Sequence, residues 1–155
     1  MADNSVLLRC TACRTVNRVP AHKLNDTPRC GKCKVLLEFP RGPVEVNAAN
    51  FRREIMEWPG VALVEFWSSR CGVCRSVAPA VRELAHLRAG SLKVATINAD
   101  QEHSLSGQFN IRAVPTFILY RHGEKIKELT GGLSTQQLEE WINASLASYR
   151  YAGSV

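Results

Sequence analysis

The 155-residue chain contains no long hydrophobic run, and nowhere does it approach the ~18 consecutive apolar residues of a membrane span. Its first five residues lack the basic and apolar segments of a secretion signal, so we expect a cytoplasmic protein with no membrane partner. It also lacks the glycine-rich fingerprint of a nicotinamide site. Any redox chemistry must therefore draw electrons from outside, and we expect no bound organic cofactor.

Acidic and aromatic residues are scarce in the first 43 residues, which carry eight Lys or Arg against three Asp or Glu. Their only aromatic side chain is Phe39, so the segment has no platform for stacking bases, and nucleic acid is not expected as a partner. The plain interpretation is a solvated basic surface. The alternative is a basic module that docks nucleic acid or an acidic protein.

No cysteine is left over, because all six fall into three C-x-x-C pairs: Cys10/Cys13, Cys30/Cys33 and Cys71/Cys74. The first two pairs are separated by 16 residues, a spacing that predicts a zinc ribbon with one tetrahedral Zn²⁺ on four thiolates. Four sulfur ligands leave no open position for water, so this zinc would be structural. Two disulfides or a redox-active cluster are the alternatives.

The composition changes near residue 40 and predicts two parts. Residues 1–40 have few large apolar side chains and need a metal to fold, residues 41–46 read as linker and domain entry, and residues 47–150 form the second domain. Periodicity there predicts an α/β sheet of mixed strand direction with helices on both faces. The expected helices lie at 47–58, 71 onward, 103–109 and 134 onward, and the expected strands at 61–67, 92–97, 116–120 and 125–129.

The third pair, Cys71/Cys74, follows a buried strand and opens a helix. The helix dipole and the unpaired N–H groups there stabilise an anion, which lowers the thiol pKa of the first cysteine and makes it a nucleophile. Cys74, one turn into the helix, is then the resolving thiol. The alternative, half of a zinc site, would need a second ligand pair, and the only one is already used.

From these motifs the chain resembles the thioredoxin family over about residues 44–148, and with its ribbon it resembles the zinc-binding thioredoxins of bacteria. The resemblance rests on Glu65-Phe66-Trp67 before the Cys-Gly-Val-Cys dithiol, on Ala78-Pro79 after it, and on Val114-Pro115-Thr116, Gly123 and Gly131. It implies a thioredoxin fold, with a mixed central sheet flanked by helices. It also implies a disulfide reductase, recharged by thioredoxin reductase, that acts on protein disulfides and is expected to be a monomer.

The resemblance also assigns roles to residues. Cys71, Cys74 and the buried acid Glu65 would be catalytic, Glu65 serving as proton acceptor and donor for Cys74. Pro115 would be a cis proline facing the dithiol, although a proline at a strand start is the plainer interpretation. Glu65 could instead be an exposed strand-edge glutamate. The implied substrate-binding surface comprises Trp67, Arg70, Gly72, Val73, Val114, Pro115 and Gly131.

Four positions depart from the family pattern. Arg70 replaces the usual Trp, Val73 the usual Pro, Glu65 the usual Asp, and Thr96 a common Lys. Arg70 adds positive charge beside Cys71 and Val73 restores an N–H donor, so both should stabilise the reduced dithiol and make the couple more oxidising. Besides the reductase, we keep a redox-switched zinc module that changes partners on oxidation as an alternative function.

Overall fold

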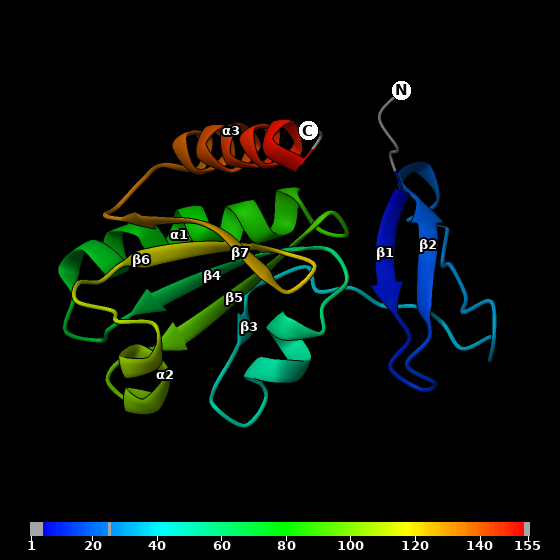
Figure 1. The fold of residues 1–155 in the computed structure, drawn as a ribbon, viewed down its shortest axis with the longest axis horizontal. Coiled ribbons are helices and arrows are strands. Elements are labelled where there is room, and N and C mark those ends of the chain that lie inside the picture. The colour runs from blue at the N-terminus through cyan, green and yellow to red at the C-terminus, as the bar shows by residue number, and fades with distance from the viewer. Residues whose placement is uncertain (1–4, 25, 154–155) are drawn as a thin grey trace.

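A small two-stranded module and a five-stranded α/β domain make up the computed structural model, which describes residues 5–24 and 26–153 (Figure 1). Residues 1–4 and residue 25, which belong to the expected ribbon, lie outside the described residues. Within the described residues, no helix is both long and apolar enough to cross a lipid bilayer.

The central sheet has the order β3-β5-β4-β6-β7. Its strands are β3 (Val44–Glu45), β4 (Val61–Trp67), β5 (Leu92–Asn98), β6 (Thr116–Arg121) and β7 (Glu124–Thr130). The first three strands run parallel, whereas β6 and β7 form antiparallel pairs, so the expected mixed sheet is confirmed. Strand β4 lies in the middle, and its residues 62–66 are all buried because neighbours and helices cover it on every side.

Helices cover both faces of this sheet (Figure 1). Helices α1 (Gly72–Leu87) and α3 (Thr135–Gly153) pack on one face around a core that includes Leu63, Phe117 and Ile142. On the other face lie the helical segment η2 (Arg52–Met56) and α2 (His103–Gln108), around a core that includes Ile55 and Phe66. The layered thioredoxin fold expected from the sequence is the fold observed.

The expected helix over residues 47–58 is the main difference. Asn47 does cap the segment, since its Oδ1 accepts the N–H groups of Ala49 and Asn50 at 2.9 and 3.0 Å. The chain then passes through a turn into the five-residue π-helical segment η2, in which the N–H of Glu57 donates to the carbonyl of Arg52 at 2.9 Å. The wider turn inserts an extra residue, a feature that hydrophobic spacing does not encode. The two-residue strand β3 was also missed, because it is too short to show periodicity.

The N-terminal module is built on β1 (Ser5–Arg9) paired antiparallel with β2 (Val16–Pro20), followed by the short 3-10 helix η1 (Ala21–Lys23). Its own small core joins the cysteines to Leu8, Val19 and Leu37. A second turn closes through the bridge between Arg29 and Leu36. The module is therefore a ribbon of short strands whose apolar core is small, as its composition predicted.

The ribbon is attached to the α/β domain through the residues that follow η2. Trp58 packs against both the ribbon core and the domain core. Arg14 forms a 2.9 Å ion pair with Glu57, whose carbonyl also accepts a bond from Arg9 Nε at 3.2 Å. Because these two arginines flank the first C-x-x-C pair, the cysteine knuckle is tied directly to the domain.

The ribbon sits at the end of the sheet where β4 begins, away from the end where α1 starts (Figure 1). The ribbon strand β1 approaches Gly60, just before β4, since a Cβ placed on Gly60 would lie 3.8 Å from the carbonyl oxygen of Leu7. Cys71 follows the other end of β4, whose seven residues span roughly 20 Å at about 3.3 Å each. The two groups of cysteines therefore occupy opposite ends of the molecule.

Candidate active site and metal site

Cys71 and Cys74 lie at the start of α1 and form a disulfide, with 5.2 Å between their Cα atoms. Cys71 is the N-cap residue of the helix, and its Sγ accepts the backbone N–H of Cys74 at 3.0 Å. This donor and the helix N-terminus would stabilise negative charge on the Cys71 sulfur once the disulfide is reduced. Cys71 is partly exposed whereas Cys74 is only 4% exposed, so substrate can approach the first sulfur and not the second.

The loop before β6 brings a second group of expected residues to the dithiol. The Val114–Pro115 peptide bond is cis, and the carbonyl oxygen of Val114 lies 3.6 Å from Cys71 Sγ. Gly131, just after β7, donates its N–H to the carbonyl of Pro115 at 2.9 Å and has φ +119°, a conformation that favours glycine. Residues far apart in the sequence thus form one surface around Cys71.

The expected surface residues of the dithiol loop lie on this same side. Arg70, Gly72 and Val73 are exposed, and Trp67 is partly exposed at the end of β4. Val73 lies against the segment after β7, because a Cβ placed on Gly132 would be 2.8 Å from Val73 Cγ1. All seven residues expected to bind substrate therefore gather near the dithiol.

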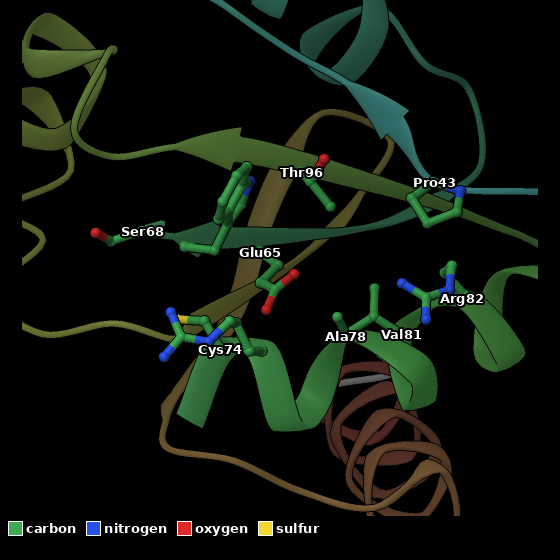
Figure 2. Close-up of a pocket in the computed structure, with 10 residues that line it drawn as sticks. Pro43, Glu65, Ser68, Cys74, Ala78, Val81, Arg82 and Thr96 are labelled. Carbon is green, nitrogen blue, oxygen red and sulfur yellow. The ribbon is translucent and has the colours of Figure 1, made fainter. Parts of the chain in front are cut away.

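Glu65 lies under the dithiol, in the middle of β4 between Thr96 of β5 and Phe117 of β6. It is 4% exposed, and its Oε2 has no hydrogen-bond partner among the described residues. Figure 2 shows its carboxylate directed at α1, between Cys74 and Ala78. Burial raises the pKa of Glu65 to about 7, so the carboxyl group can gain or lose a proton near neutral pH.

Glu65 and Cys74 line the same cavity of about 310 Å³, which also borders Pro43, Val81 and Arg82 (Figure 2). A cavity of this size can hold water next to a polar group. Thr96 also lines it and carries no charge, so the strand position beside Glu65 supplies no cation to lower the carboxyl pKa. The buried placement of Glu65 agrees with the family's pattern and excludes an exposed strand edge.

Two supporting residues escaped the sequence analysis. The hydroxyl of buried Ser68 donates to Asp100 Oδ2 at 2.5 Å and accepts the N–H of Arg70 at 3.2 Å. The carbonyl of Ser68 also accepts the N–H of Cys71 at 3.2 Å. These bonds fix the loop that leads from β4 into the dithiol. No spacing in the sequence links Ser68 to Asp100, which belongs to the turn after β5.

The four remaining cysteines come together in the ribbon, with all their sulfur atoms within 4.8 Å of one another. The sulfurs of Cys10 and Cys33 are 3.5 Å apart, and those of Cys13 and Cys30 are 3.6 Å apart. Cys10 and Cys30 are fully buried. Four convergent thiols are a donor set that can hold a metal ion.

The two C-x-x-C knuckles have the same local geometry, which explains the convergence. Arg14 and Lys34, which follow the two pairs, both have φ +67°, and their N–H groups return to the carbonyls of Cys10 and Cys30. Backbone N–H groups also point at sulfur, from Cys13 to Cys10 at 3.5 Å and from Lys32 to Cys30 at 3.4 Å. These N–H groups stabilise negative charge on the two sulfurs, which favours the thiolate form that a metal requires.

Models of known protein families match both parts of the chain. The family model for thioredoxin matches residues 42–144, and the model for the N-terminal zinc ribbon of thioredoxin 2 matches residues 9–35. The chain is 31% identical to thioredoxin C-3 of Corynebacterium nephridii over 141 residues, covering 91% of this chain and 96% of that protein. It is also 31% identical to thioredoxin 1 of a Nostoc species over 102 residues, covering 66% and 95%.

A solved structure supports the same assignment. A single-residue mutant of thioredoxin from Halobacterium salinarum matches with a TM-score of 0.63 and 27% sequence identity, covering 70% of this chain and 94% of that one. The cis peptide beside the dithiol, the buried acid beneath it and the sheet order occur together in one domain. The chain therefore belongs to the thioredoxin family of thiol–disulfide oxidoreductases, and its N-terminal segment is similar to the zinc ribbon of thioredoxin 2.

Proposed function

We propose that the chain reduces disulfides of protein substrates with its Cys-Gly-Val-Cys dithiol. The observation that carries the proposal is the position of Cys71 at a helix N-terminus, partly exposed and within 3.6 Å of the Val114 carbonyl oxygen. The Cys71 thiolate attacks one sulfur of the substrate disulfide, and the other substrate sulfur leaves as a thiolate. Cys74 then attacks Cys71 Sγ, which releases the second substrate sulfur. The dithiol loses two electrons and the substrate gains them.

In this proposal Glu65 is the proton acceptor for Cys74. Its position in the same cavity as Cys74 and its pKa of about 7 support that role, because a base works best when its pKa is near the working pH. Glu65 is one methylene longer than the usual Asp, and the 310 Å³ cavity offers room for a water molecule between carboxylate and thiol. A water molecule there would relay the proton from the Cys74 thiol to the Glu65 carboxylate.

The surface around the dithiol would hold the substrate as an extended segment. Backbone groups of Val114 are placed to bond the substrate's main chain, with Pro115 and Gly131 shaping the groove beside it. Trp67, Arg70, Gly72 and Val73 would line its other side. A substituent at Gly131 would narrow the groove as well as strain the backbone.

The ribbon would carry one structural Zn²⁺ on Cys10, Cys13, Cys30 and Cys33. A tetrahedral zinc with Zn–S bonds of about 2.3 Å has sulfur–sulfur edges of about 3.8 Å. Two of the observed separations, 3.5 and 3.6 Å, are close to this length, and all four sulfurs lie within 4.8 Å of one another. Zinc would supply folding energy to a module whose apolar core is too small to hold it together.

Electrons for the next cycle would come from a thioredoxin reductase. The protein would act in the cytoplasm and as a monomer. The ribbon would end near residue 40, and the catalytic domain would comprise residues 47–150.

The test is catalysed reduction of insulin by dithiothreitol with the wild-type chain and with Cys71→Ser. We expect turnover with the wild type and none with the variant. Absence of turnover with both would refute the reductase and favour a redox-switched zinc module. Metal analysis of the same samples should give one zinc per chain, and Cys10→Ser should lower it without abolishing the Cys71 reaction.

A further inference from the structure

The three segments that border the dithiol carry charge of only one sign. They are residues 67–75, residues 110–116 and residues 130–133, and together they contain three arginines and no acidic residue. The second segment approaches Cys71 through the Val114 carbonyl at 3.6 Å, and the third is joined to the second by the Gly131 to Pro115 hydrogen bond of 2.9 Å. The three arginines, Arg70, Arg75 and Arg112, are called the basic rim below.

Each cation of the basic rim is exposed and belongs to a segment that borders the dithiol. Arg70 directly precedes Cys71. Arg75 folds back over the same loop, since its Nη1 donates to the carbonyl of Ser69 at 3.0 Å. Arg112 lies two residues before Val114, with its Nε directed at Asn110 Oδ1 at 3.4 Å. Positive charge therefore flanks the attacking sulfur on two separate segments.

No carboxylate in the described part of the chain forms an ion pair with these arginines. Asp100, which binds the dithiol loop, and Glu65, which lies beneath it, are not among their ion-pair partners. Asp100 accepts the Ser68 hydroxyl at 2.5 Å, and Glu65 is buried beneath the dithiol. The basic rim is therefore available to groups on another molecule.

The centre of this surface is apolar. Val73 is 52% exposed and lies against Gly132, beside the cysteine that attacks the substrate. A substrate segment laid across the groove would thus meet an apolar contact at its centre and cations on both sides.

We propose that the basic rim selects disulfides whose flanking residues are acidic, with an apolar residue next to the attacked cysteine. This inference rests on the proposed reductase function and names its substrate class. An exposed cation–carboxylate pair changes affinity by roughly 1.4- to 5-fold. Three such pairs give an expected preference on the order of tenfold at low salt, which salt screens because the contacts are exposed.

The experiment uses three peptides of equal length that are closed by one disulfide and differ only in having Glu, Gln or Lys on both sides of each cysteine. The pre-reduced, zinc-loaded full chain is mixed with each peptide, and the second-order rate constant of a single turnover is measured. Each rate is divided by the rate with cysteamine, whose reactive form carries one thiolate and one ammonium group and so has no net charge; this corrects for the reactivity of the peptide itself. We expect the Glu peptide to exceed the Lys peptide by on the order of tenfold, and the ratio to fall towards one as salt is added.

The variants locate the effect. The triple variant Arg70→Gln, Arg75→Gln, Arg112→Gln should bring the Glu-to-Lys ratio close to one, whereas Arg52→Gln, which removes an exposed charge beyond the opposite end of β4, should keep it. Because both peptides meet the same dithiol, a changed reactivity of Cys71 cancels from the ratio. Equal rates for all three peptides, a preference for Lys, or an unchanged ratio in the triple variant would overturn the inference and leave the reductase intact. Reduction of none of the peptides would overturn the reductase itself.

Discussion

Glu65 gives the clearest quantitative prediction, because its burial makes folding stability depend on pH. Burial raises its pKa from 4.5 to about 7 in the folded protein. At 1.36 kcal/mol per pKa unit, this difference corresponds to about 3 kcal/mol. Below the lower pKa the carboxyl group is protonated in both states and costs nothing. Above the higher pKa it is ionised in both states, and the folded protein bears the full cost of the buried charge.

The wild-type protein should therefore lose up to about 3 kcal/mol of stability as the pH rises through this window, and Glu65→Gln should not. Gln has nearly the same shape and no charge, and whatever its buried amide costs is the same at every pH. The unfolding free energy of the variant should therefore increase relative to that of the wild type as the pH rises from about 5. The difference should reach its maximum at about pH 8.5.

The assay is urea unfolding of the oxidised protein, followed by circular dichroism at several pH values. Any pH dependence of the ribbon cancels in the difference between variant and wild type. Glu45→Gln is the matched control, since it removes an exposed carboxylate from the edge strand β3. If the gap between Glu65→Gln and the wild type stays constant with pH, the assignment of Glu65 as a buried group with a raised pKa is wrong.

Three further predictions follow from the site and the ribbon. Gly131→Ala should destabilise the fold by about 1–3 kcal/mol, because the φ of +119° at this position strains any residue with a Cβ, and it should also slow insulin reduction. The control Gly107→Ala lies in a helix with open space around it and should stabilise the fold by about 0.5–1 kcal/mol. If urea unfolding ranks the two variants in the opposite order, this reasoning is wrong. Removing zinc with a chelator should change the fluorescence of Trp58, because this side chain packs on the ribbon core. The circular dichroism of the α/β domain should persist. Loss of the whole circular dichroism spectrum would contradict this prediction. Equilibration with glutathione should give a reduction potential above about −270 mV, and the double variant Arg70→Trp, Val73→Pro should lower it; a wild-type value at or below that mark would refute the argument from these two residues.

The placement of the ribbon bears on the idea of a redox switch. Its cysteines lie beyond the start of β4, and the dithiol lies past the end of that strand, roughly 20 Å away. The two groups of thiols are too far apart for direct exchange within one molecule. Any influence of a bound metal on the dithiol must pass through packing, and the Arg14–Glu57 pair and Trp58 are among the contacts between the ribbon and the domain.

Much of this site could be predicted from local patterns. A C-x-x-C pair after a buried strand and before a helix fixes the position of Cys71, because chain order alone places it at the helix N-terminus. The spacing of the other four cysteines likewise brings two similar knuckles together around one point. Glu65 stood out because it is the one charge in an apolar strand. In each case the chemistry depends on neighbours in sequence.

Other features depend on segments that are distant in the chain, and local patterns could not supply them. The bond from Ser68 to Asp100 joins the ends of β4 and β5, and the basic rim forms only because the segment that carries Arg112 reaches Cys71 through the Val114 carbonyl. The raised pKa of Glu65 is set by how completely α1 and the two neighbouring strands cover it. The residue types and their order thus dictated which groups can react and which can hold a metal, since those properties follow from spacing along one strand, turn or helix. Folding set the charge around the dithiol, the solvation of its buried acid and the separation of the two cysteine sites, because burial and electrostatics sum over everything that the fold brings near.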